Sequence, residues 1–169
     1  SSNASLTANT TLYAQWKAKT YTVTFDANGG KGDMDAESFT HGVEKALTAN
    51  AFEKTGYTFD GWNTKEDGTG TAYADKAKAT ITANTTLYAQ WKINKYTVKF
   101  VNGSEVLSEE EYDYGTAAAD IETPDDPTKQ ADAQHTYVFT GWTPAIADVT
   151  ADVTYKATYA ESTRKFKTT

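Results

Sequence analysis

The stretch TANTTLYAQWK occurs twice in this chain, at residues 7–17 and again, unchanged, at residues 82–92. In each copy Leu, Ala and Trp occupy alternate positions, with Tyr and Gln between them. A period of two predicts a β-strand that turns one apolar face toward a core. A looser form, TADVTYKATY, follows at residues 150–159. Such repetition is typical of a chain built from tandem structural units, each closed by this strand.

Two further segments recur in the same order and delimit the units. YTVTF at residues 21–25 returns as YTVKF at 96–100, and GYTFDGW at 56–62 returns as TYVFTGW at 136–142. Since each unit runs from an opening strand to a closing strand, we expect the first TANTTLYAQWK to close a further unit upstream. The expected organisation is a cloning remnant at 1–4, the last strand of an upstream repeat at 5–17, repeat module one at 21–92, a diverged repeat module two at 96–160, and a tail or the start of a next unit at 161–169.

The strand patterns predict a mainly β fold, α+β at most, in which each module has about four strands and a short crossover. Short helical turns are expected at 117–121 and 74–79. Lys156 takes the place of Tyr88 in the closing strand of module two, so this position should face solvent. Tyr88 and its counterpart Tyr13 are therefore candidates for a surface binding role. The predicted core residues are Tyr21, Val23, Phe25, Phe59, Trp62, Leu87, Trp91, Val98, Phe100, Phe139, Trp142, Tyr155 and Tyr159.

Composition excludes several classes of function. The net charge is −7, and the only basic cluster is Arg164, Lys165 and Lys167 near the end of the chain, so nucleic-acid binding is not expected. No apolar run has the length of a membrane helix, which argues against direct membrane insertion. Cysteine is absent, which rules out disulfides and thiolate metal sites.

A search for reactive groups yields no catalytic, cofactor-binding or metal site. Asp26, Asn28 and Glu37 have the spacing of calcium ligands in an EF-hand loop, but Lys31 replaces the glycine that such a loop needs, so a polar turn is expected. The two histidines, His41 and His135, occupy unrelated positions in the two modules. The run of glutamates at 109–111 is typical of a charged sheet edge. The sequence therefore predicts a protein that is not an enzyme.

Three segments, YTVTFDANGG, GYTFDGWNT and TLYAQWK, together resemble the Listeria–Bacteroides repeat, the B repeat of internalins. The match spans most of residues 21–92, whereas module two resembles a diverged relative in which Tyr159 replaces the closing Trp. The resemblance implies a compact β-grasp-like unit, similar to ubiquitin in its sheet and crossover. It also implies an exported bacterial protein, often attached to the cell wall and typical of Gram-positive species, with tandem copies that act as stalk, spacer or adhesion module.

The expected function is thus that of a non-enzymatic repeat region of an extracellular surface protein, whose partners are the neighbouring repeats. One alternative is a glycan- or host-protein-binding module that uses exposed rings such as Tyr13, Tyr88, Tyr73 or Tyr114. A second alternative is an accessory region of a large secreted enzyme. Because a strand with an apolar face and unpaired backbone groups tends to add to other sheets, self-association through residues 5–17 is also expected.

Overall fold

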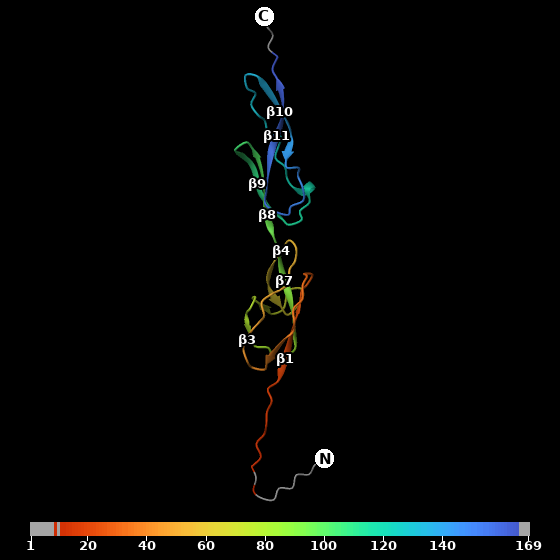
Figure 1. The fold of residues 1–169 in the computed structure, drawn as a ribbon, viewed down its shortest axis with the longest axis vertical. Coiled ribbons are helices and arrows are strands. Elements are labelled where there is room, and N and C mark those ends of the chain that lie inside the picture. The colour runs from red at the N-terminus through yellow and green to blue at the C-terminus, as the bar shows by residue number, and fades with distance from the viewer. Residues whose placement is uncertain (1–8, 10, 166–169) are drawn as a thin grey trace.

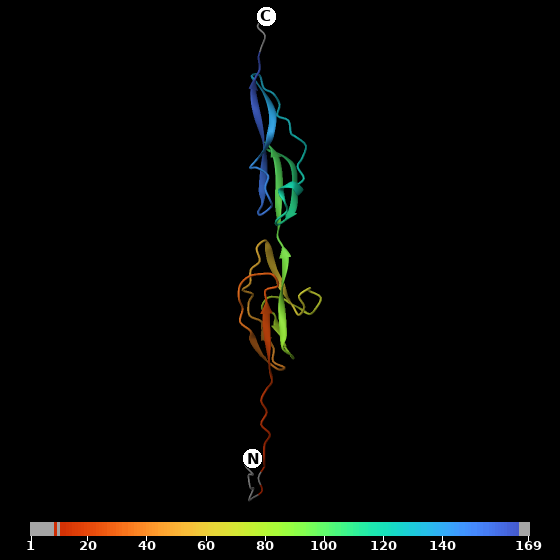
Figure 2. The ribbon, with the colours of Figure 1, turned by 90° about the vertical axis from the view of Figure 1, so that its right-hand side faces the viewer.

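The computed structural model describes residues 9 and 11–165. The chain forms two β-sheet units arranged end to end in an elongated molecule (Figure 1, Figure 2). Residues 11–19 run outward from the first unit as an extended, exposed segment that belongs to no strand. None of the described residues forms a helix that is long and apolar enough to cross a membrane.

Unit one is a five-stranded sheet with a small two-stranded sheet beside it. The order of the large sheet is β2-β1-β7-β4-β5, and its central pair, β1 and β7, is parallel while the other pairs are antiparallel. The strands β3 and β6 form the small sheet. The unit thus has three short strands beyond the four expected from the sequence. The strand bounds are β1 Thr20–Asp26, β2 Glu37–Thr40, β3 Lys45–Ala46, β4 Tyr57–Asn63, β5 Ala72–Tyr73, β6 Lys78–Ala79 and β7 Thr85–Ile93.

Unit two repeats the four main strands with the same neighbours. Its order is β10-β11-β8-β9, again with a parallel central pair, here β8 and β11. Phe25 pairs with Leu87 in unit one, and Phe100 pairs with Tyr155 in unit two, so the registers of the two central pairs correspond. The elements are β8 Lys95–Asn102, β9 Glu105–Asp113, the 3₁₀ helix η1 Ala118–Asp120, β10 His135–Thr143 and β11 Val153–Thr163.

The two expected helical turns have different outcomes. The turn near 117–121 is confirmed as the 3₁₀ helix Ala118–Asp120. The turn at 74–79 is wrong, because Lys76 adopts a positive φ of 58° and the chain then enters β6. Pairing of β6 with β3, more than thirty positions earlier in the sequence, replaces local helical bonds there. The mainly β class is confirmed.

Strands β4 and β10, which contain the Gly-Trp pairs, each have a bulge. The bulge in β4 explains how Phe59 and Trp62, three positions apart, share one face. The pairing of β4 with β7 shifts between Phe59 and Gly61, where Gly61 has φ 126°. The pairing of β10 with β11 shifts in the same way at Gly141, with φ 128°. A positive φ is accessible to glycine at little cost, so the Gly that precedes each Trp is part of the bulge.

The core of unit one surrounds Trp62, whose ring centroid lies 4.8 Å from that of Phe25 and 4.9 Å from that of Phe59. Of the predicted core residues, six are almost fully buried: Val23, Trp62, Leu87, Val98, Phe100 and Tyr155. The other seven are partly buried: Tyr21, Phe25, Phe59, Trp91, Phe139, Trp142 and Tyr159. Further buried residues come from β2 and the irregular connections: Phe39, Leu47, Phe52, Ile81, Ile121 and Val149.

Candidate functional site

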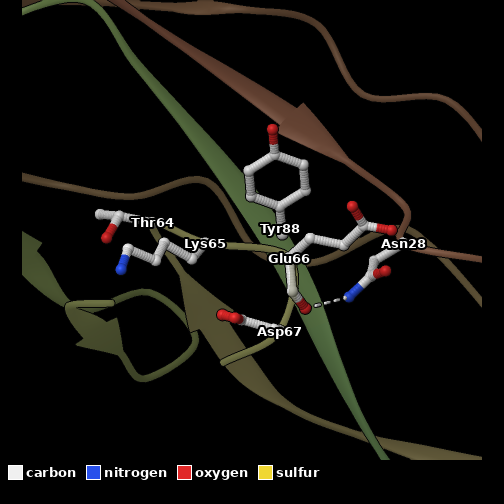
Figure 3. Close-up of a pocket in the computed structure, with 6 residues that line it drawn as sticks. All are labelled: Asn28, Thr64, Lys65, Glu66, Asp67 and Tyr88. Carbon is white, nitrogen blue, oxygen red and sulfur yellow. Dashed lines mark hydrogen bonds between the residues drawn. The ribbon is translucent and has the colours of Figure 1, made fainter. Parts of the chain in front are cut away.

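An open groove on unit one contains Tyr88, one of the two tyrosines proposed for binding. The groove lies between β7 and the loop that joins β4 to β5, and the Tyr88 ring projects from β7 into it (Figure 3). The Asn28 side-chain amide donates to the carbonyl oxygens of Ala89, at 2.9 Å, and Glu66, at 3.0 Å. These bonds attach the loop to the sheet, so the groove has a defined shape.

The loop that forms one wall of this groove is organised by a buried amide. Asn63, at the end of β4, is 3% exposed. Its Nδ2 donates to the Gly68 carbonyl at 2.9 Å, and its Oδ1 accepts from the amides of Lys65 and Gly70 at 3.0 and 2.9 Å. One buried side chain thus satisfies three backbone groups of the loop, at Lys65, Gly68 and Gly70. Sequence reasoning missed Asn63, since an Asn after a strand is also an ordinary turn residue.

The groove offers little that could perform chemistry. Hydrogen bonds from the amide and hydroxyl of Thr69 hold the pKa of Asp67 below its usual value, so this carboxylate serves as a turn cap. Tyr13, the other proposed surface tyrosine, is 79% exposed but lies in the extended segment outside the unit. The two rings therefore do not form one surface. Tyr73 packs against the core of unit one, and Tyr114 lies between the units.

Asp26 and Glu37, whose spacing in the sequence resembles that of calcium ligands, do not come together in the structure. Asp26 accepts a hydrogen bond from the Asn28 amide at 2.8 Å, which closes a local turn. Glu37 instead pairs with Lys45 at 2.9 Å and with the Thr48 amide at 2.6 Å. Partial burial acts to raise the pKa of Glu37, but these partners outweigh it, and the pKa lies below its usual value. Among the described residues there is no group of three His, Asp or Glu side chains suited to a metal ion.

The two histidines lie in different units. His41 packs edge-on against Tyr21, with ring centroids 5.8 Å apart. His135 lies between Asp132, at 3.3 Å, and Glu161, at 3.1 Å. A hydrogen bond from the Tyr137 hydroxyl, joined by two backbone amides, lowers the pKa of Asp132 to about 2. This cluster closes the turn before β10, and its groups are satisfied by one another.

The run of glutamates at 109–111 lies on β9, at the outer edge of the unit two sheet. Glu109 pairs with Lys99 of the neighbouring strand at 2.9 Å. Such a charged edge discourages the addition of further strands.

The most specific arrangement of residues joins the two units. Only Asn94 separates β7 from β8. Its amide donates to the Gly56 carbonyl of unit one at 2.9 Å, and its carbonyl accepts from the Tyr114 amide of unit two at 2.8 Å. Its side-chain Oδ1 also accepts from the Thr58 hydroxyl at 2.6 Å. One residue thus bonds to both units, and we call Asn94 with Gly56, Thr58 and Tyr114 the junction.

Aromatic packing supports these hydrogen bonds. The Tyr114 ring lies so close to Gly56 that a Cβ atom there would come within 2.0 Å of a ring carbon. Gly56 also has φ 79°, a conformation that favours glycine. Beside it, Lys95 and Asp113 form an ion pair at 2.8 Å. Gly56 is therefore required both for the turn and for the contact between units.

Two units of one topology, linked through a single shared residue, define a tandem-repeat β-module protein. Residues 21–90 match the family model of the Listeria-Bacteroides repeat domain, and this region is a member of that family. The resemblance noted from the sequence is thus confirmed.

Similar regions occur in much longer proteins. The chain is 39% identical over 137 residues to a predicted Gly-rich membrane protein of Evansella cellulosilytica, covering 78% of this chain and 15% of that protein. It is 36% identical over 126 residues to internalin H of Listeria monocytogenes, covering 72% of this chain and 20% of internalin H. The chain therefore carries a repeat region that recurs in membrane and surface proteins, and it spans only a small part of these relatives.

Proposed function

We propose that this chain is a non-enzymatic spacer, in which tandem units are held in line so that they project other parts of a surface protein. The observation that carries the proposal is the junction at Asn94, where one residue bonds to both units. A linker of one residue leaves little room for independent motion of the units, in contrast to a flexible linker of many residues. Repetition of such a junction would give a stalk whose length grows with each unit.

The setting that we propose follows from the relatives. Likeness to internalin H and to membrane proteins supports a location outside the cell, in a parent protein attached to the cell wall. The parallel central pair formed by the first and last main strands supports a β-grasp-like unit in which an irregular crossover takes the place of the helix. A spacer is favoured over a glycan-binding module that uses Tyr88, because among the described residues no second aromatic ring lines the Tyr88 groove. No described feature favours an accessory role in a large enzyme.

The spacer function predicts a narrow distribution of distances between the two units. Because the chain has no cysteine, single labelling sites can be placed at the exposed positions Asp60 and Glu110 as D60C and E110C. Pulsed electron spin resonance between spin labels should give one narrow peak. The substitution Tyr114→Ala should broaden it, because the ring that packs on Gly56 is lost.

Two controls calibrate this measurement. Tyr13→Ala makes the same chemical change at an exposed site outside the junction, and should leave the peak unchanged. Insertion of Gly-Gly-Ser-Gly after Asn94 provides a flexible reference. A distribution in the unaltered chain as broad as that of this reference would show that the units are not held in line, and the proposal would be wrong.

We also propose that copies of this chain associate weakly through residues 5–17, of which 9 and 11–17 are described. Leu12 and Trp16 are 76% and 92% exposed, although the same sequence forms the central strand β7 in unit one. Light scattering at increasing concentration should show an average mass above that of one chain, and removal of residues 1–17 should abolish the increase. The double substitution Leu12→Thr and Trp16→Thr should act like the deletion. A constant monomer mass would contradict this expectation.

A further inference from the structure

The end of unit one that faces away from unit two repeats the backbone arrangement of the junction. The His41 amide donates to the Lys19 carbonyl at 2.8 Å, as the Tyr114 amide donates to the Asn94 carbonyl at 2.8 Å. Lys19 lies just before β1, as Asn94 lies just before β8. In the sequence, Trp16 precedes Tyr21 by the same number of positions as Trp91 precedes Tyr96. The backbone hydrogen bond and the sequence spacing thus give Lys19 the position at this end of unit one that Asn94 has at the junction.

The side chains of this end also correspond. His41 packs edge-on against Tyr21 at 5.8 Å, and Tyr114 packs against Tyr96 at 6.4 Å. Each of these aromatic residues is followed by a glycine with positive φ, 74° at Gly42 and 83° at Gly115. An added Cβ would meet nothing within 4 Å at either glycine, so the two turns have the same form, but His41 of unit one is exposed.

The corresponding face of unit two is covered. There, the Tyr114 ring rests on Gly56, at the start of the GYTFDGW strand of the preceding unit. In unit one nothing among the described residues occupies the place that Gly56 has at the junction, and His41 is exposed. The segment that enters this face, residues 11–17, has the sequence of residues 86–92, which lead into the junction at Asn94.

We propose that Lys19, Tyr21 and His41 form a second junction surface, which receives the end of another unit of this same kind. Residues 11–17 are the closing strand of that unit, and the His41 ring rests on the glycine that opens its GYTF-like strand. Lys19 supplies the two backbone bonds but lacks the side-chain acceptor of Asn94, so the bond to a Thr58-like hydroxyl is absent here. The inference rests on the proposed spacer function and extends it to a specific surface.

The test adds a unit of the proposed kind to the full chain. A second copy of residues 21–81 is inserted between Leu6 and Thr7, so that residues 7–17 complete a unit with the sequence of 21–92. Spin labels at the Asp60 position of the added unit and at Asp60→Cys of unit one report the new junction. The pair D60C and E110C reports the junction at Asn94 in the same chain.

We expect the distance distribution across Lys19 to be as narrow as that across Asn94. His41→Ala should broaden the first distribution alone, and Tyr114→Ala should broaden the second alone. In addition, the amides of residues 12–17 should gain protection from hydrogen exchange, because in the present chain these residues are exposed.

Three results would overturn the inference. A distribution across Lys19 as broad as that of a Gly-Gly-Ser-Gly insertion after Lys19, with a narrow one across Asn94, would reject the second junction and leave the spacer proposal standing. Broad distributions at both places would reject both proposals. If residues 12–17 gain no protection from hydrogen exchange when the copy is added, this segment is not the closing strand of the added unit.

Discussion

Replacing Trp62 with Ala should lower the free energy of unfolding of unit one by roughly 3–5 kcal/mol, the range for loss of a buried large aromatic side chain. The side chain is 1% exposed and lies against Phe25, Phe59 and Phe52, at centroid distances of 4.8, 4.9 and 6.0 Å. Its removal leaves a cavity that these rings cannot fill without moving the bulged strand β4. Urea titration followed by nuclear magnetic resonance signals of unit one would measure the change.

Two comparison variants make this prediction specific. Trp142→Ala, at the corresponding position of unit two, should cost about half as much, because Trp142 is only partly buried. Trp62→Phe should cost less than Trp62→Ala, because it keeps most of the apolar contact and removes an indole N–H that is buried without a hydrogen-bond partner. A loss below about 1 kcal/mol for Trp62→Ala would be the size of an ordinary surface change and would contradict a core role.

Replacing Asn63 with Ala should destabilise unit one by about 2–4 kcal/mol, since it removes three hydrogen bonds and leaves backbone groups of Lys65, Gly68 and Gly70 without a partner. The loop that forms the wall of the Tyr88 groove should lose its fixed conformation. Urea titration would give the free energy, and amide hydrogen exchange over residues 64–71 would report the loop.

Asn84→Ala is the matched control for this change. Asn84 is exposed, and its side chain accepts one hydrogen bond, from the Thr22 amide at 2.9 Å. Its loss should cost no more than about 1.5 kcal/mol, the upper value for a typical single hydrogen bond. If Asn63→Ala and Asn84→Ala have equal effects, the burial of Asn63 does not have the importance that we assign to it.

The alternation of apolar residues predicted the main strands well. Val23, Leu87, Val98 and Tyr155 lie on inward faces because side chains alternate along a strand whatever its neighbours are. Tyr88, which comparison of the two units predicts to face solvent, is partly buried and lines the groove. These inferences need only the local geometry of a strand.

The short strands and the groove loop could not be predicted in this way. Strand β6 pairs with β3 across a long stretch of sequence, and a two-residue strand carries no period that distinguishes it from a turn. Phe39, Leu47 and Phe52 are buried as single apolar residues in short or irregular segments. Their burial depends on which sheet face the chain happens to cross, a property of the whole fold.

The repeated strands and their order in the sequence were enough to predict a tandem β-repeat organisation, the main strands and the family of residues 21–90, because these depend on side-chain period and on likeness between segments. The tertiary structure alone revealed the junction. The module bounds expected from the sequence, 21–92 and 96–160, leave Ile93, Asn94 and Lys95 between them as a three-residue linker. In the fold, β7 and β8 extend into that linker and leave Asn94 between Gly56 and Tyr114, two residues far apart in the sequence. Hydrogen bonds between such distant groups exist only when both sheets are formed, which is why the relation between the units could not be read from local patterns.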